Sequence, residues 1–183
     1  MRDEKEKGPG DGTASRGPRA DARTTERGND ASRRACPTPS FSDAEALAKA
    51  GHQLIPLRPR DKAPRDKDWP RRAYALDELM EWARGGGNLG VRLRATDLVV
   101  DADPRNYPEG RDSLAELARD VGLDLDAVPH TITGGGGHHY WLRKPADFET
   151  LGKLPQYPGI DFKSRGFQVV APGSVHPSGE RYR

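Results

Sequence analysis

The sequence contains one cysteine, few aromatic residues and no long apolar segment. The lone thiol of Cys36 excludes an intramolecular disulfide and a zinc site built from several thiolates. An uninterrupted apolar run of roughly 18 residues, which a membrane-spanning helix needs, does not occur. Charged residues dominate the N-terminus and no apolar stretch follows them, so we expect no secretory signal. These absences predict a cytoplasmic protein that does not bind a membrane.

Polar and conformationally permissive residues are abundant instead. Of the 183 residues, 33% are hydrophobic and 32% are charged, and the chain contains 21 glycines and 16 prolines. Residues 1–38 show no hydrophobic periodicity and cannot bury enough apolar area to offset the entropy of ordering. We therefore expect a disordered leader over residues 1–38 and one folded domain over residues 39–183.

The charge is unevenly distributed along the chain. Residues 1–36 carry nine basic and seven acidic side chains, which accounts for the whole net charge of +2. The rest of the chain is neutral overall and is therefore not a uniformly basic nucleic-acid binder. Any polyanion must be bound through local patches or metal ions.

The hydrophobic pattern predicts a mixture of helices and strands. Helices are expected after a capping box at Ser42–Glu45, at Leu76–Arg84, and at Ser113–Val121 with Ser113 as the N-cap. Strands are expected at residues 53–57, 89–94, 96–103, 130–133, 139–144, 159–164 and 167–175. This order predicts an α+β fold with a mixed central sheet and flanking helices.

Two carboxylates, Asp101 and Asp103, follow an apolar run. In a strand, side chains two residues apart point to the same face, so these carboxylates project together. Such a pair repels unless a proton or cation intervenes, and hard oxygen ligands suit Mg²⁺ or Mn²⁺. We predict a divalent-metal site, the alternative being an acidic strand end that begins a turn. Relief of the repulsion would leave stability unchanged or raised when either acid is removed.

Four glycines, Gly134–Gly137, precede His138 and His139. Their backbone N–H groups are accessible to an oxyanion, and a neighbouring histidine can hydrogen-bond a phosphate. Adjacent strand residues point to opposite faces, so only one histidine can share a face with the acids. The alternative is a flexible glycine hairpin with two surface histidines.

A third acid, Asp161, lies between two apolar residues of a predicted strand. It therefore points away from the face that Ile160 and Phe162 bury, and Lys163 shares its face. This spacing places a cation beside a potential metal ligand. A structural salt bridge is the alternative.

The order of these motifs resembles one family, the bifunctional DNA primase/polymerase (prim-pol) domain of the archaeo-eukaryotic primase superfamily. The resemblance extends over roughly residues 51–182. The matching positions are Gly51, Pro56, Leu57, Lys62, Pro64, Trp69, Asp101, Asp103, Gly136, Gly137, His139, Asp161, Lys163, Pro172, Ser174, His176, Gly179 and Tyr182. It implies an RRM-like catalytic core of the archaeo-eukaryotic primase type.

The resemblance also implies a role for each motif. The catalytic, metal-holding acids would be Asp101, Asp103 and Asp161, with Mg²⁺ or Mn²⁺ as the cofactor. The nucleotide-binding residues would be Gly136, Gly137, His139, Lys163 and Arg165. The implied reaction is template-directed nucleotidyl transfer from nucleoside triphosphates on single-stranded or primed DNA, with a separate helicase as a partner.

Two other functions stay open at this point. One is a non-catalytic or truncated nucleic-acid-binding protein of replication or of a mobile element. The other is a metal-dependent phosphodiesterase, because the same acids and histidine occur in such enzymes.

A template path is predicted at the loop that follows the first predicted strand. Residues 58–72 carry seven basic and three acidic side chains. The predicted DNA-binding residues are Arg58, Arg60, Arg65, Trp69 and Arg71, with Trp69 as a stacking platform for a base. The alternative is a solvated connection in which Trp69 packs into the core.

Overall fold

A computed structural model describes residues 41–149 and 152–183. All of them belong to one unit of the chain, Ala35–Arg183. The predicted leader, residues 1–38, lies outside the described residues. The elements are α1 (Ser42–Lys49), β1 (Gln53–Leu57), α2 (Leu76–Arg84), β2 (Asn88–Arg92), β3 (Asp97–Ala102), η1 (Pro104–Asn106), α3 (Ser113–Val121), η2 (Leu125–Ala127), β4 (His130–Ile132), β5 (His138–Arg143), β6 (Ile160–Lys163) and β7 (Gln168–Val170).

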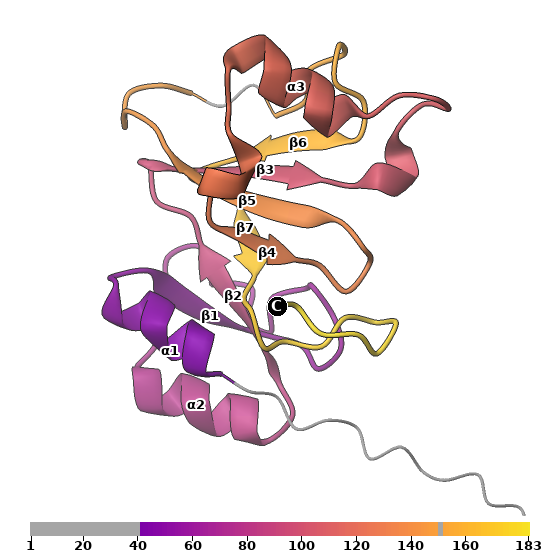
Figure 1. Cartoon of the computed structure of the whole chain (residues 1–183). Coiled ribbons are helices and arrows are strands. Elements are labelled where there is room, and N and C mark those ends of the chain that lie inside the picture. The colour runs from indigo at the N-terminus through magenta and orange to yellow at the C-terminus, as the bar shows by residue number, and fades with distance from the viewer. Residues whose placement is uncertain (1–40, 150–151) are drawn as a thin grey trace, which may run out of the picture. The chain divides into compact units, whose positions relative to one another are not determined.

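The described strands form two antiparallel sheets (Figure 1). One has three strands in the order β1-β2-β7, and the other has four in the order β4-β5-β3-β6. The α+β class is therefore confirmed, although two antiparallel sheets replace the single mixed sheet that we expected. The RRM-like core stays a prediction. No helix of the described part of the chain is long and apolar enough to cross a membrane.

Helices α1 and α2 lie against the three-stranded sheet (Figure 1). Helix α2 buries Leu79, Met80 and Ala83, whose spacing places them on one helical face. Trp82 Nε1 also donates hydrogen bonds to two backbone carbonyls, those of Leu57 (2.9 Å) and of Asn88 (3.2 Å). These contacts fix the helix to both ends of the β1–β2 connection.

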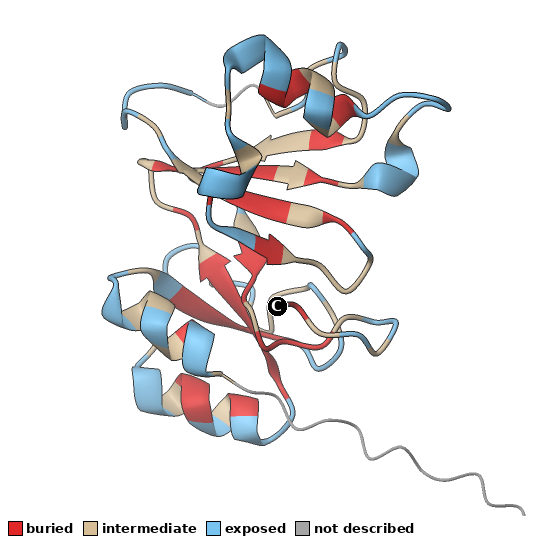
Figure 2. Ribbon diagram, in the orientation of Figure 1, coloured by how far each residue is buried: buried red, intermediate tan, exposed pale blue. Residues whose placement is uncertain are grey.

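Helix α3 covers one face of the four-stranded sheet (Figures 1 and 2). Leu117 of the helix packs with Val100 of β3, Tyr140 of β5 and Ile160 of β6, all of which are buried. Strand residues alternate between faces, so the residues between these apolar positions point to the opposite face. The apolar alternation therefore decides which side of the sheet carries the polar side chains.

Two turns connect the sheets, because β2 and β3 belong to different sheets, as do β6 and β7. In the first turn, Asp97 accepts hydrogen bonds from the backbone N–H of Arg94 (2.8 Å) and from its guanidinium (2.8 Å). Burial alone would raise the pKa of Asp97, but the hydrogen bonds from Arg94 outweigh it and hold the pKa below its ordinary value. In the second turn, Ser164 Oγ donates to the Asp97 carbonyl (2.6 Å). Asp97 thus ties both turns together.

The two predicted helix caps are wrong. Ser42 is the first residue of α1, and its predicted capping box makes no side-chain cap hydrogen bond. At α3 the cap is Asp112, whose carboxylate accepts from the backbone N–H groups of Leu114 and Ala115. Ser113 is buried one position further on. An acidic cap gains from the positive end of the helix dipole, which explains why the aspartate takes this position.

Candidate active site

Strand register lines up polar residues across the four-stranded sheet. Asp101 of β3 pairs with Asp161 of β6 on one side and with His139 of β5 on the other. Antiparallel partners have Cα atoms about 4.5–5.5 Å apart and side chains on the same face. The two acids and the histidine therefore form one row, while His138 points to the opposite face, where it stacks on Tyr140.

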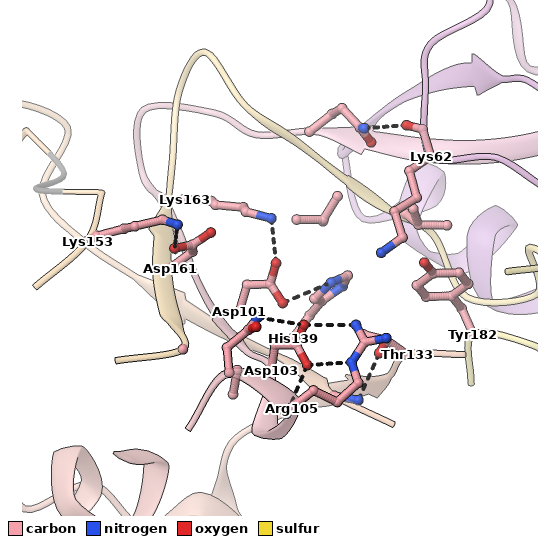
Figure 3. A pocket seen from close by; sticks show the side chains of 17 residues that line it. Lys62, Asp101, Asp103, Arg105, Thr133, His139, Lys153, Asp161, Lys163 and Tyr182 are labelled. Atoms are coloured by element: carbon pink, nitrogen blue, oxygen red, sulfur yellow. Dashed lines mark hydrogen bonds and ion pairs between the residues drawn. The ribbon is translucent and has the colours of Figure 1, made fainter. Parts of the chain in front are cut away.

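A pocket of about 410 Å³ lies over this row (Figure 3). Its walls include Asp101 and His139 from the four-stranded sheet and β7 residues 168–170 from the three-stranded sheet. Lys62, from the loop after β1, and Tyr182, near the end of the chain, complete another side. The pocket is therefore formed between the two sheets, and its polar side chains come from segments that are far apart in the sequence.

Asp101 lies at the centre of the pocket and contacts two basic side chains (Figure 3). Lys163 Nζ donates to Asp101 Oδ2 at 2.5 Å, and both side chains are 22% exposed. On the other side, His139 Nε2 lies 3.5 Å from Asp101 Oδ1. Each carboxylate oxygen of Asp101 therefore faces a nitrogen.

Asp103 is held by the turn that follows β3. Arg105 forms a two-pronged pair with it, Nε to Oδ1 and Nη2 to Oδ2, both at 2.8 Å. Asn106 Nδ2 adds a hydrogen bond to Oδ2 at 3.0 Å. The hydrogen bond from the Arg105 side chain, above all, holds the pKa of Asp103 below its ordinary value. Asp103 is therefore ionised and oriented toward Arg105.

Asp161 also faces a cation, the exposed Lys153, with Nζ 3.4 Å from Asp161 Oδ1. Each of the three acids thus has its own basic partner: Lys163 for Asp101, Arg105 for Asp103 and Lys153 for Asp161. The expectation that removing an acid leaves stability unchanged or raised stays a prediction, but the pairing argues against it for Asp101, because removal would leave Lys163 without its ion-pair partner.

His139 is a buried and neutral histidine. Only 5% of its surface is exposed, and its Nδ1 is buried without a hydrogen-bond partner among the described residues. Burial lowers the pKa of His139 to about 4, against the opposing effect of Asp101. At neutral pH the ring therefore carries no charge, and one of its nitrogens can donate a hydrogen bond while the other accepts one.

The glycine segment forms a tight turn that leads into β5. The N–H of Gly136 donates to the carbonyl of Thr133 (3.0 Å), and the N–H of Gly137 donates to Thr133 Oγ1 (3.0 Å). A Cβ on Gly137 would lie 2.4 Å from the carbonyl oxygen of Ala102, so only glycine fits beside the end of β3. The two amides that we expected to bind phosphate are used inside the turn, and Gly137 instead allows the close approach of β5 to β3.

The donor set matches a hard divalent cation in kind, because carboxylate oxygens are the ligands that Mg²⁺ and Mn²⁺ prefer. The side chains do not assemble such a site in this conformation. Among residues 41–149 and 152–183, no group of three histidine, cysteine or acidic side chains is arranged to hold a metal ion. The reason is visible in Figure 3, where Asp101, Asp103 and Asp161 turn toward basic side chains. Binding of a cation would require these partners to be exchanged.

Several predicted residues lie away from this pocket. Arg165 lines a different pocket together with Trp69 and Arg71. The family resemblance implied that it binds the nucleotide together with Lys163, but β6 ends at Lys163 and a turn follows. The alternation of a strand therefore no longer applies to Arg165.

The predicted template loop divides into paired and unpaired arginines. Arg65 is ion-paired with Asp66 (2.9 Å) and Glu78 (3.1 Å), so its charge is already neutralised. Arg60 donates a long hydrogen bond to a backbone carbonyl (3.4 Å), and Arg58 is exposed. The alternative reading of Trp69 is partly correct, since it is half-buried against a core cluster while it also borders the second pocket.

The sequence-based interpretation missed several residues of the pocket, among them Arg105, Asn106 and Lys153. Arg105 and Asn106 follow Asp103 in the segment Asp-Pro-Arg-Asn, where a proline after an aspartate is a turn signal. That turn could have been read as one that folds a cation back onto the acid. Lys153 reaches Asp161 from an isolated bridge between residues 153 and 161, for which the sequence carries no periodic pattern.

The pocket combines three carboxylates, a neutral histidine and several cations, a composition suited to binding a metal-bound polyphosphate. A scan against protein-family models matches residues 44–183 to the description "Bifunctional DNA primase/polymerase, N-terminal" (Prim-Pol). No curated protein matches the chain. The match spans well over half of the sequence and includes every residue of the pocket. The chain therefore belongs to the family of bifunctional DNA primase/polymerase N-terminal domains.

Proposed function

We propose that this chain is a template-directed nucleotidyltransferase that makes or extends primers from nucleoside triphosphates. Family membership indicates nucleotidyltransferase activity of the primase/polymerase type, with a DNA template and nucleotides as substrates. The observation that carries the proposal is the row of Asp161, Asp101 and His139 across three strands, with Asp103 at the end of β3 in the same pocket.

In this reaction a 3′-hydroxyl oxygen bonds to the α-phosphorus of the triphosphate. The bond between the α-phosphorus and the bridging oxygen breaks, pyrophosphate leaves, and the hydroxyl proton is lost. The protein must therefore bring two negatively charged reactants together and stabilise the charge that develops on the phosphate oxygens. A pocket with cations on several sides meets the first requirement.

The family generally uses divalent metals, and we propose Mg²⁺ or Mn²⁺ for this chain. Asp101, Asp103 and Asp161 would hold the cation, which would stabilise negative charge on the phosphate oxygens. Arg105 and Lys163 would then contact phosphate in place of the carboxylates that they pair with in this structure. Exchange of one anion for another leaves the number of charge-assisted hydrogen bonds unchanged, so the cost of opening these pairs is offset.

His139 would position the triphosphate through a hydrogen bond rather than through charge. Its pKa of about 4 keeps the imidazole neutral at neutral pH. A neutral ring in a row of carboxylates leaves the positive charge of the site to the lysines, the arginine and the metal.

The predicted helicase partner gains no support from the fold or from the family match, and a cytoplasmic location remains a prediction of the sequence.

One observation favours a second function, a nucleic-acid-binding protein without catalysis. All three acids are neutralised by basic side chains of the same chain, so the pocket is internally balanced. If these pairs never open, the acids have only a structural role.

Incubation of the protein with a primed template, labelled nucleoside triphosphates and Mg²⁺ or Mn²⁺ separates the possibilities. Extension of the primer supports the proposed function, and it should require the metal. A shift in mobility without extension would support the non-catalytic binder, and shortening of the primer would indicate a phosphodiesterase. Either of the last two results would refute the proposal.

A further inference from the structure

A second pocket, of about 270 Å³, lies at one end of the three-stranded sheet. We call it the arginine pocket; it is lined by Gln53, Trp69, Pro70, Arg71, Arg92, Leu93, Arg94, Arg165 and Gly166. Gln53 and Arg92 are paired residues of β1 and β2, and Arg165 comes from the turn before β7. Four of the lining residues are arginines, and the described lining includes no acidic residue.

Three of the four arginines carry a charge that no carboxylate of the described residues neutralises. Arg94 is the exception, because it is paired with Asp97 (2.8 Å). Arg92 donates only to neutral acceptors, which include the side-chain oxygen of Gln53 (2.8 Å) and the Trp69 carbonyl (2.8 Å). These bonds orient its guanidinium without cancelling the charge.

The other two arginines, Arg71 and Arg165, are exposed. Within residues 41–149 and 152–183, the structure gives neither side chain an ion-pair or hydrogen-bond partner. By contrast, Arg72, which follows Arg71 in the sequence, is paired with Asp66 and Glu78. Arg71 and Arg165 thus extend from two different loops at the border of the same pocket and leave their donors free for a ligand.

Trp69 provides a fixed aromatic wall beside these cations. It is half-buried and packs against the cluster of Ile55, Leu57, Val170 and Tyr182. Its carbonyl also holds Arg92, so the backbone at this point is anchored to β2. An aromatic side chain next to a group of guanidinium donors is the combination that binds a base together with its phosphate.

We propose that the arginine pocket binds a phosphate of single-stranded nucleic acid, with the neighbouring base against Trp69. The pocket lies outside the active-site pocket, but two segments border both. The loop between β1 and α2 contributes Lys62 to the active site and Trp69 and Arg71 to the arginine pocket. The β6–β7 segment contributes Lys163 and Arg165 in the same way, so the same two segments border both pockets.

This inference rests on the proposed function only for the identity of the strand as template or primer. It assigns Arg165 to strand binding rather than to the nucleotide and adds Arg92 as a strand-binding residue. Arg65 no longer belongs to the predicted template path. Strand binding itself needs neither a metal nor a nucleotide, so it can be measured without catalysis.

The test is a salt titration of binding to a fluorescent single-stranded oligodeoxythymidine, measured by anisotropy in EDTA. Each phosphate contact contributes about −0.7 to the slope of log affinity against log salt. The double variant Arg71→Ala/Arg165→Ala should therefore flatten the slope by about 0.7, the contribution of the one phosphate held in the pocket. The control Arg84→Ala/Arg119→Ala removes two exposed arginines from helices α2 and α3 and should keep the wild-type slope. An equal slope in both double variants would overturn the inference.

A photo-crosslink locates the strand directly. Oligonucleotides that contain 5-iododeoxyuridine should crosslink to the tryptic peptide 68–71. Free thymidine monophosphate or inorganic phosphate, each at the same concentration as the oligonucleotide, should not prevent this crosslink. Crosslinks confined to other peptides, or loss of the crosslink to the small anions, would contradict strand binding here. If the wild type extends primers but the two double variants have equal slopes, the arginine pocket alone is refuted. If Arg71→Ala/Arg165→Ala has the flatter slope but the wild type does not extend primers, the proposed function alone is refuted.

Discussion

The neutral state of His139 makes the stability of the protein depend on pH. Burial lowers the pKa of His139 from 6.5 to about 4, while in the unfolded chain the ring regains its ordinary pKa. Above about pH 6.5 both states are neutral and nothing is lost. Below about pH 6.5, the His139 ring is protonated in the unfolded chain but not in the folded protein. The free energy of unfolding therefore falls by about 1.4 kcal/mol for each pH unit, until the folded ring is protonated as well. Between about pH 7.5 and about pH 4.5, His139 should therefore lower the free energy of unfolding by about 2–3 kcal/mol.

Urea unfolding of the wild type and of His139→Gln at both pH values, in metal-free buffer, measures this cost. The wild type should lose about 2–3 kcal/mol more than the variant over the same interval, because glutamine does not titrate there. Equal losses would refute the assigned burial and pKa of His139. If the variant does not fold, the same quantity follows from an NMR titration of the wild type, in which the His139 ring should not protonate above about pH 5.

Four further changes test the framework around the site. Asp97→Ala should cost about 3–5 kcal/mol in urea unfolding, because it leaves a guanidinium and a backbone N–H without their buried acceptor, and Asp97→Asn should cost less. Trp82→Phe should lower the unfolding free energy by about 1 kcal/mol through loss of its hydrogen bonds, and a neutral result in thermal unfolding would contradict their role. Gly137→Ala should cost about 1–3 kcal/mol, seen as a lower denaturation midpoint, since its Cβ would collide with a backbone carbonyl. Asp101→Asn should lower the free energy of unfolding by about 1 kcal/mol, measured by calorimetry, because Lys163 loses its ion-pair partner. An unchanged or higher stability would mean that repulsion among the acids dominates.

The strand pattern of the sequence predicts a face of the sheet for Asp101 and Asp161, and the register of β3 with β6 pairs these two residues. Asp103 follows Ala102, the last residue of β3, so its position depends on the turn and not on strand alternation. Strand alternation also separates His139 from His138. The pairing of β3 with both β5 and β6 could not be derived in this way, because register depends on which strands become neighbours.

Strand alternation does not predict the basic partners of Asp103 and Asp161. Arg105 contacts Asp103 through a turn, and Lys153 contacts Asp161 from a bridge between loops. Arg165, which the family resemblance implied at the nucleotide, lies outside the predicted strands and lines another pocket. The contact of Lys153 with Asp161 depends on tertiary proximity, which local sequence periodicity does not encode, whereas the contact of Arg105 with Asp103 lies within a local turn.

Nucleotide incorporation by matched acid variants tests the central claim most directly. Asp101→Asn removes the charge at the centre of the row, and Asp147→Asn removes an exposed acid that lies outside the pocket. On a primed template with Mg²⁺ or Mn²⁺, the first variant should lose on the order of 10²-fold or more in incorporation rate, since several kcal/mol of charge stabilisation would be lost. The second should retain the wild-type rate. An Asp101→Asn protein that is folded by circular dichroism and still extends the primer at the wild-type rate would contradict the assignment of this pocket as the active site.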